Sequence, residues 1–278
     1  MTSAYQKPLR WSDPANKIFA KQVAFTAPPH DFDAAPSDFL RMAPAHVGVH
    51  GRMLHVDSYA HQLDQRVKNF DLLEEYVACM ANNGADVCGQ VGTNWVHAGG
   101  KTPQQIGDFC DRMAQTYDTP LHMAGLCLVQ ACRDMGVQSI ALNAAYYWPD
   151  WRDGIARFLR DAGLDLIYVG NFVDLGLYET QAEVNAKTWI FPMDIALESM
   201  HRLAEKAPEA DAYLINGMPN WRDENGLTHR PLSLAAAMEA ETGKPLICSD
   251  TALYWRIFKT IGAAPTRGGL GKLLDGLS

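Results

Sequence analysis

Residues 85–92, "ADVCGQVG", indicate the fold of this chain more directly than any other stretch, and they lie within "GADVCGQVGTNWVHAGG" at positions 84–100. Apolar and small residues follow one another there without a polar face, as in a strand buried on both sides. The preceding segment 66–84, "RVKNFDLLEEYVACMANNG", has apolar residues at the spacing of one helix face and ends in glycine. The sequence thus predicts a helix, a buried strand and then a polar loop.

The same alternation of helical patterns and short apolar runs continues to the C-terminus. It predicts parallel sheets with crossover helices, which bind ligands beyond the carboxyl ends of their strands. The further expected strands are "AHVGVHG" (45–51), "VQSIALNAAY" (137–146), "LDLIYVGN" (164–171), "ADAYLING" (210–217) and "KPLICSD" (244–250). The further expected helices are "TPQQIGDFCDRMAQTYD" (102–118), "GLCLVQACRDMG" (125–136), "WRDGIARFLRDAG" (151–163), "MDIALESMHRLAEKAP" (193–208), "PLSLAAAMEAETG" (231–243) and "TALYWRIFKTIG" (251–262).

Two similar units divide the chain. "GADVCGQVGTN" (84–94) and "EADAYLINGMP" (209–219) each follow a helical pattern and end in a glycine-containing turn. This internal repeat indicates two lobes whose turns face each other across a cleft. We expect lobe one over residues 46–135 plus 244–278 and lobe two over 136–243. Residues 1–45 are rich in Pro, Ala and Asp without a clear period, which predicts an irregular N-terminal arm.

Composition and charge exclude several classes of function. The 278 residues carry a net charge of −8, which argues against nucleic acid or an anionic membrane as the main partner. No apolar run approaches the roughly 20 residues that span a bilayer, and the first residues lack the apolar core of a signal peptide. A cytoplasmic location is therefore expected. The six cysteines form no C-x-x-C pair and are expected to be free thiols, mostly buried.

The loops after the strands are rich in Gly, Asn and Thr and poor in carboxylates and lysines. Such neutral donors suit a small anionic substrate. Neither G-x-G-x-x-G nor a phosphate-binding loop ending in Gly-Lys-Ser/Thr occurs. The segment "VGVHGRMLHVDSYAH" fits no compact zinc pattern, and we expect no metal, although irregularly spaced loop ligands for a divalent ion stay an alternative. Its candidate ligands would be His50, His55, Asp57 and His61.

From about Phe70 to the C-terminus the sequence resembles the aspartate/glutamate racemase superfamily, and within it the arylmalonate decarboxylases and maleate cis-trans isomerases. The resemblance rests on "GADVCGQVGTN", "MGVQSIALNAAY", "EADAYLINGM", "TGKPLICSDTALYW" and "GGLGKLL". It implies an α/β fold of two pseudo-symmetric lobes, each with a four-stranded parallel sheet flanked by helices. It also implies an active site between the lobes that needs no metal or organic cofactor.

Three segments correspond to the family's substrate-binding positions. The resemblance places a substrate carboxylate against the turn Gly92-Thr93-Asn94, the tyrosine Tyr146 with Tyr147 beside it, and the turn Asn216-Gly217-Met218. Hydroxyl, amide and backbone N–H groups at these positions would stabilise an enolate-like charge. The alternative is that Thr93 and Asn94 only cap their turn.

The sequence departs from the racemases at the two turns. Gly92 and Gly217 stand where those enzymes carry cysteines, and a glycine cannot supply a proton. His50, at the end of an expected strand, and His97, after the first turn, are the candidate proton donors because imidazole titrates near neutral pH. Either histidine could instead serve only as a structural hydrogen-bonding group.

Other residues near the strand ends have two readings each. Cys88 lies in mid-strand and is expected to pack in the core, whereas Cys248 or Ser249 could contact substrate. We expect Asp250 to cap the helix that follows. The tryptophans form either an aromatic wall for a planar substituent or a brace for loops or a subunit interface. They are Trp95, Trp148, Trp151, Trp221 and Trp255.

These observations favour a cofactor-independent enzyme that acts next to the carboxylate of a small dicarboxylic acid, aryl- or alkyl-malonate-like. Decarboxylation through an enolate-like intermediate is the leading reaction because it needs one proton delivery and no second base. The alternatives are an isomerase, racemase or other lyase of the same superfamily, and a non-catalytic relative that binds a small carboxylate. A homo-oligomer stays open.

Overall fold

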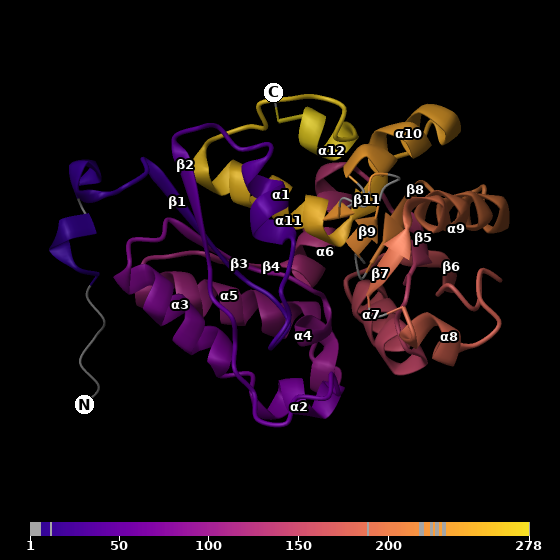
Figure 1. Cartoon of the computed structure of the whole chain (residues 1–278), viewed down its shortest axis with the longest axis horizontal. Coiled ribbons are helices and arrows are strands. Elements are labelled where there is room, and N and C mark those ends of the chain that lie inside the picture. Colours follow the sequence, from indigo (N-terminus) through magenta and orange to yellow (C-terminus); the bar gives the residue numbers. More distant parts are fainter. Residues whose placement is uncertain are drawn as a thin grey trace.

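The computed structural model describes residues 7–277 except 12, 188, 217–219, 223–224, 226–227 and 230–231. Two α/β lobes lie side by side (Figure 1). The sheet of lobe one is parallel, with strand order β2-β1-β3-β4, and that of lobe two is parallel, with order β11-β8-β5-β6. The strands of lobe one are β1 (Lys21–Thr26), β2 (Val47–Gly51), β3 (Val87–Gln90) and β4 (Leu121–Met123). Those of lobe two are β5 (Ser139–Asn143), β6 (Asp165–Gly170), β8 (Ala212–Ile215) and β11 (Leu246–Cys248).

Both sheets share one topology. Reading the strands of each sheet in chain order, the second lies beside the first, the first beside the third and the third beside the fourth. β1 therefore corresponds to β5, and β3 corresponds to β8. This correspondence confirms the predicted α/β fold of two pseudo-symmetric lobes, and it places the loops after β1, β3, β5 and β8 at equivalent positions.

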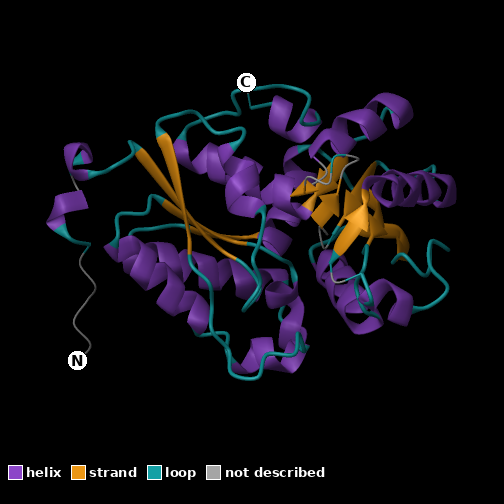
Figure 2. Cartoon of the chain, viewed as in Figure 1, coloured by secondary structure: helices purple, strands orange, loops and turns teal. Residues whose placement is uncertain are grey.

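Helices cover both faces of the lobe-one sheet (Figure 2). The longer helices are α3 (Leu72–Asn82), α5 (Pro103–Tyr117), α6 (Ala124–Asp134), α7 (Pro149–Asp161), α9 (Met193–Lys206), α10 (Leu232–Thr242) and α11 (Ser249–Ile261). The shorter ones are α1 (Ala35–Leu40), α2 (Leu63–Lys68), α4 (Asn94–His97), α8 (Gln181–Asn185) and α12 (Lys272–Asp275). Helix α5 begins as its sequence indicates, because the Thr102 hydroxyl accepts a hydrogen bond from the Gln105 N–H.

Smaller elements complete the chain. Three 3₁₀ turns occupy Leu9–Trp11, Pro14–Asn16 and Ala98–Gly100. A third sheet, of three strands, joins β7 (Ile190–Pro192), β9 (Asn220–Arg222) and β10 (Thr228–His229). None of the helices in the described part of the chain combines the length and the apolar character that crossing a membrane requires.

The prediction of an irregular arm over residues 1–45 is wrong for its second half. β1 pairs with both β2 and β3, so it lies inside the lobe-one sheet, and α1 packs near β2. Only "KQVAFT" forms β1, and the apolar run within it, Val23 to Phe25, is fully buried. A run this short, flanked by Pro- and Asp-rich segments, gives little periodic signal.

The predicted boundary between the lobes is also wrong at residues 244–248. β11 pairs with β8 and therefore belongs to the lobe-two sheet. The chain returns to lobe one only with α11, which packs against α6 and β3. The last strand of one lobe thus passes directly into a helix of the other, at the junction where the lobes meet.

Candidate functional site

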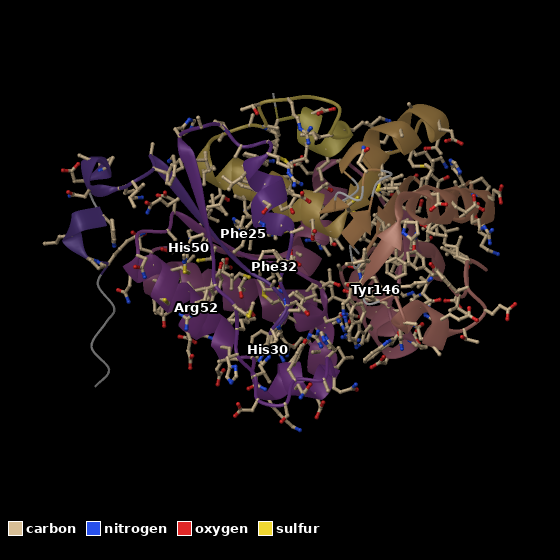
Figure 3. All side chains as sticks on the ribbon, in the orientation of Figure 1. Phe25, His30, Phe32, His50, Arg52 and Tyr146 are labelled. Atoms are coloured by element: carbon tan, nitrogen blue, oxygen red, sulfur yellow. The ribbon has the colours of Figure 1, made fainter. Side chains whose placement is uncertain are left out.

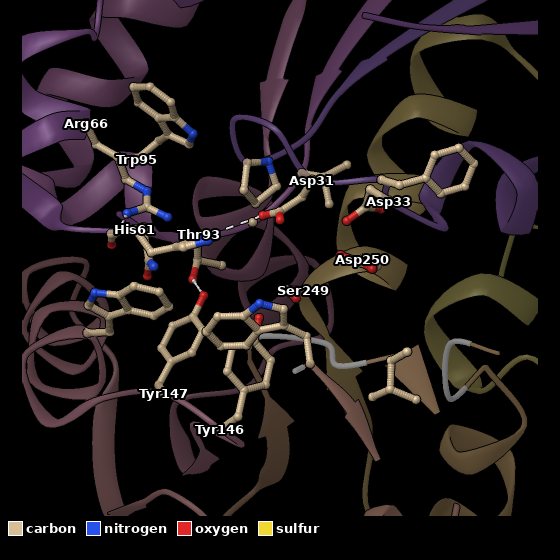
Figure 4. A pocket seen from close by; sticks show the side chains of 18 residues that line it. Asp31, Asp33, His61, Arg66, Thr93, Trp95, Tyr146, Tyr147, Ser249 and Asp250 are labelled. Carbon is tan, nitrogen blue, oxygen red and sulfur yellow. Dashed lines mark hydrogen bonds and ion pairs between the residues drawn. The ribbon is translucent and has the colours of Figure 1, made fainter. Parts of the chain in front are cut away.

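A cavity of about 220 Å³ lies between the two lobes at the carboxyl ends of their strands. Loops after β1, β3 and β5, the first residues of α11, and α2 with the segment before it all contribute to its wall (Figure 4). Its lining residues are Pro28, Asp31, Phe32, Asp33, His61, Arg66, Val91, Gly92, Thr93, Asn94, Trp95, Tyr146, Tyr147, Trp151, Trp189, Ile190, Ser249 and Asp250.

Two buried hydroxyls meet in this cavity. Thr93 Oγ1 and the Tyr147 hydroxyl lie 2.9 Å apart, and either can donate to the other. Gly92 precedes them with φ +85°, a left-handed conformation that glycine adopts without strain. Burial raises the pKa of Tyr147, against lowering contributions from Thr93 and Arg66, so the phenol stays protonated and can donate to an anion. The hydroxyl that contacts Thr93 is therefore that of Tyr147, while Tyr146 lines the cavity beside it.

The loop after β5 is held in place by its own hydrogen bonds. Asn143 Oδ1 accepts from the Ala145 N–H at 2.8 Å, and Ala145 has φ +49°. Asn171 Nδ2 donates to the Tyr147 carbonyl at 2.9 Å, and Gln181 Nε2 donates to the Tyr146 carbonyl at 3.0 Å. A loop fixed at this many points presents its two phenols to the cavity in a preorganised position.

Arg66 supplies a buried positive charge. Its residue is 2% exposed, and it is the one arginine or lysine among the described residues that line the cavity. Its Nη1 donates to the backbone carbonyls of His61 at 2.7 Å and Gln62 at 3.3 Å, and its guanidinium lies 5.1 Å from the Trp151 ring centroid. No described carboxylate forms an ion pair with it, and its Nε has no described hydrogen-bond partner. Arg66 also acts on the Asp31 carboxyl, but without an ion pair between them. A buried cation that no ion pair compensates favours the entry of an anion into the cavity.

Asp31 and His61 are the partly buried titratable pair of the cavity. His61 Nδ1 lies 4.0 Å from Asp31 Oδ2. Burial, helped by the nearby Asp33 carboxylate, raises the pKa of Asp31 from 3.8 to about 6, although Arg66 and His30 oppose the shift. Burial lowers the pKa of His61, and Arg66 and His30 lower it further. The cavity thus holds a carboxylic acid that exchanges its proton near neutral pH beside a neutral imidazole.

The raised pKa of Asp31 makes a prediction about stability. The folded state binds this proton more tightly than the unfolded chain, so the group's contribution to stability falls as pH rises from about 4 to about 6. We therefore expect Asp31→Asn to raise the melting temperature at pH 7.5 and to leave it nearly unchanged at pH 4. Thermal unfolding at both pH values measures this, and an equal shift at the two would contradict it.

The predicted substrate-binding residues are placed as follows. Gly92, Thr93, Asn94 and Ser249 line the cavity. Asn216 follows β8 and is fully buried, and its side chain acts on the Tyr147 phenol, whose pKa it lowers. Gly217 and Met218 lie outside the described residues.

The two histidines predicted as proton donors do not reach the cavity. His50 is exposed at the end of the edge strand β2 and lines a separate depression, well apart from Tyr146 (Figure 3). His97 is buried, and burial, with Arg66 and Arg157, lowers its pKa to about 3, so it stays neutral. Its Nε2 lies 3.1 Å from Asn94 Oδ1, an acceptor, so Nε2 donates and orients the Asn94 amide. His97 is a positioning residue for Asn94 in this structure.

The cysteines take structural places. Cys88 is buried in β3, as predicted, and burial raises its pKa to about 12. Cys248 is fully buried at the N-cap of α11, and it does not line the cavity. The expectation that Asp250 caps this helix is wrong, because the helix already begins at Ser249.

Chemical modification of the thiols should therefore spare function. None of the described cavity-lining residues is a cysteine, and Cys88, Cys127, Cys132 and Cys248 are buried. We expect iodoacetamide on the folded protein to leave substrate turnover unchanged, with the four buried cysteines labelled only after unfolding. Parallel loss of activity with labelling would contradict this assignment.

Aromatic rings form one wall of the cavity. Tyr146 and Trp189 have ring centroids 4.7 Å apart, and Trp151 stacks on Trp189 at 6.2 Å and 13°. This supports the aromatic-wall reading for Trp151 and Trp95, which line the cavity, whereas Trp148 and Trp255 do not. Among the described residues no three His, Cys, Asp or Glu side chains gather closely enough to hold a metal ion.

Sequence reasoning missed Asp31 and Arg66, and it named His61 only as a candidate ligand of an alternative metal site. Asp31 lies in the segment predicted to be an irregular arm, and Arg66 lies in a two-turn helix without a motif. The internal repeat could have indicated Asp31. If lobe one duplicates residues 137–217, it needs a strand before residues 45–51, and the loop after that strand would then contribute to the site.

Fold and site together define the class of this protein. It is a two-lobed parallel α/β protein whose described residues place neutral hydrogen-bond donors and a buried cation between the lobes. A family model described as arylmalonate decarboxylase matches residues 33–274. The chain therefore belongs to the arylmalonate decarboxylase family. The search of curated protein sequences found no match.

Solved structures agree with this fold. A crystal structure of arylmalonate decarboxylase superposes with a TM-score of 0.66 at 20% identity, over 91% of this chain and 99% of that one. The maleate isomerase Iso from Pseudomonas putida S16 gives 0.70 at 14% identity, over 93% and 99%. The Nocardia farcinica maleate cis-trans isomerase gives 0.65 at 15% identity, over 92% and 98%. These proteins are enzymes, and their likeness at such identities establishes the shared fold.

Proposed function

We propose that this chain is a cofactor-independent decarboxylase of a small, malonate-like dicarboxylic acid. One observation carries the proposal. The buried hydroxyls of Thr93 and Tyr147 and the buried cation of Arg66 gather in one cavity, and Asp33 and Asp250 lie on the other side of it from Arg66 (Figure 4). The hydroxyls and the cation thus give the cavity one side that attracts a carboxylate.

The retained carboxylate binds on the cationic side. Thr93 and Tyr147 donate hydrogen bonds to its oxygens, and Arg66 compensates its charge. When the neighbouring C–C bond breaks, its electron pair moves into this carboxylate and forms an enediolate with more negative charge on the same oxygens. Donors that already point at those oxygens stabilise this state more than the ground state.

The departing carboxylate would face the opposite side. Arg66 is the one cation among the described lining residues, and it lies on the other side, so a carboxylate here is not compensated by it. A buried, weakly solvated carboxylate is favoured to leave as neutral CO₂. The aromatic wall of Tyr146, Trp151 and Trp189 suits a planar or bulky substituent on the reacting carbon.

Isomerase chemistry is the second possibility within the superfamily. A structure of the Nocardia farcinica enzyme is described with a covalently bound succinylcysteine intermediate. In the present chain Gly92 occupies the first turn, and no described cavity-lining residue is a cysteine. Decarboxylation needs no such nucleophile, which is why we favour it.

The test follows CO₂ release from malonates that carry aryl or alkyl substituents, with maleate alongside. α-Proton exchange of the monocarboxylic products in D₂O is recorded in parallel. CO₂ release from a malonate supports the proposal. Conversion of maleate to fumarate without CO₂ release would favour an isomerase. If no acid reacts but malonate raises the melting temperature, the protein is a carboxylate-binding relative and the proposal is overturned.

A further inference from the structure

The proposed reaction leaves one chemical step without a residue. After CO₂ departs, the enediolate must receive a proton on carbon. Thr93 and Tyr147 are engaged with the carboxylate oxygens in this scheme, while His50 and His97 lie outside the cavity. Neither turn offers a thiol, since Gly92 and Gly217 stand at the two positions where the racemases carry cysteines.

Asp31 is placed to supply that proton. It lies on the loop after β1, the counterpart in lobe one of the loop after β5 that carries Tyr147. Figure 4 shows Asp31 on the side of Thr93 away from Tyr147, with Arg66 and His61 on one flank and Asp33 on the other. A carboxylate bound at Thr93 and Tyr147 would therefore present its neighbouring carbon toward Asp31.

We propose that Asp31 is the proton donor of this decarboxylation, in place of the cysteine thiol of the superfamily. This inference rests on the proposed function. The C–C bond to the departing carboxylate breaks, and its electron pair is delocalised over the α-carbon and the retained carboxylate as the enediolate. The Asp31 O–H bond then breaks and a C–H bond forms, which leaves a monocarboxylate product and an Asp31 carboxylate. Water restores the Asp31 proton, so each turnover consumes one proton from solvent.

The surroundings keep Asp31 protonated when a dianion is bound. Asp33 favours the neutral acid, whereas Arg66 and His30 favour its anion. His61, with a lowered pKa, and Tyr59, with a pKa of about 12, face it as neutral groups near pH 7. A bound dicarboxylate compensates Arg66 and adds its own negative charge. Both changes raise the proton affinity of Asp31 at the moment when the proton is needed.

The experiment uses the full chain with a malonate that carries one aryl and one methyl group, since its monocarboxylic product is chiral. We expect the wild-type enzyme to give one enantiomer in excess, and Asp31→Asn to lower kcat/KM about 10²-fold. The residual product of this variant should approach a racemate, because water then protonates either face. Malonate should still raise its melting temperature, which shows that the cavity binds.

The pH profile provides a test without any variant. kcat/KM of the wild-type enzyme should fall as pH rises above about 6, since the donor must be protonated, and the corresponding fall in kcat should lie at higher pH. Asp31→Asn should lose this limb. The matched control is Asp57→Asn, because Asp57 has a side chain 98% exposed and lies outside the cavity.

The outcomes separate the two proposals. Wild-type CO₂ release with unchanged rate and enantiomeric excess in Asp31→Asn overturns the role of Asp31 and leaves the decarboxylase standing. Absence of the pH limb in the wild-type enzyme likewise counts against Asp31. Failure of the wild-type protein to release CO₂ from any malonate overturns the proposed function, and the role of Asp31 with it.

Discussion

Replacing Thr93 by Val, or Tyr147 by Phe, is expected to lower kcat for decarboxylation about 10²–10³-fold, equivalent to about 2.7–4 kcal/mol of transition-state stabilisation. Each change removes one hydroxyl of the 2.9 Å pair and keeps almost the same side-chain volume. The loss should appear mainly in kcat, because the donors bind the enediolate more strongly than the starting carboxylate. Steady-state CO₂ release measures it.

The double variant shows whether the two hydroxyls act together. Because each orients the other, we expect it to lose little more than the worse single variant. Tyr76→Phe is the matched control: it removes a buried tyrosine hydroxyl that contacts the Gly89 carbonyl and does not line the cavity. Full activity in Thr93→Val together with Tyr147→Phe would remove both residues from the reaction.

Arg66→Met is expected to lower kcat/KM about 10³-fold. Methionine keeps an apolar stem against Trp151 but removes the cation that faces the substrate carboxylate, a loss of about 2–5 kcal/mol for a desolvated charge pair. Wild-type protein at malonate 100 times its Kd should gain about 2.7 kcal/mol of stability, and Arg66→Met should lose this gain. Kinetics and ligand-dependent melting measure the two effects.

Two further variants control for the charge itself. Arg66→Lys keeps the charge but not the planar fork, so it should retain intermediate activity. Arg112→Met removes an arginine that pairs with Glu74 away from the cavity, and it should behave as wild type. If malonate still stabilises Arg66→Met as it does the wild-type protein, the carboxylate binds elsewhere.

Local patterns were sufficient for most of the fold. Each of these patterns depends on interactions between residues close in sequence, and each corresponds to the element it predicts. They are the apolar run 85–92, the helical periodicities and the cap at Thr102. β1 is not predicted from the sequence, because its apolar core has only three residues. A central strand of this kind is recognisable only from the neighbouring strands that bury it on both sides. β11 was assigned to the wrong lobe for a related reason, since strand pairing is a long-range choice.

The site could be predicted only in part. The sequence predicts Gly92, Thr93 and Asn94 at the end of a strand, because they follow a strand pattern in a repeated unit. It likewise predicts a site tyrosine after β5. Which of two adjacent tyrosines meets Thr93 depends on the turn at Ala145 and its bonds to Asn143 and Asn171. No sequence pattern encodes that choice.

The sequence by itself determined two α/β lobes, a cleft between them, neutral donors at the first turn and the absence of a thiol at Gly92. Only the tertiary structure decided which charged groups share the cleft. Asp31, His61 and Arg66 come from a loop and a short helix far from Thr93 in sequence, and their proton affinities depend on mutual distance and burial. Those quantities exist only once the chain has brought the two lobes together.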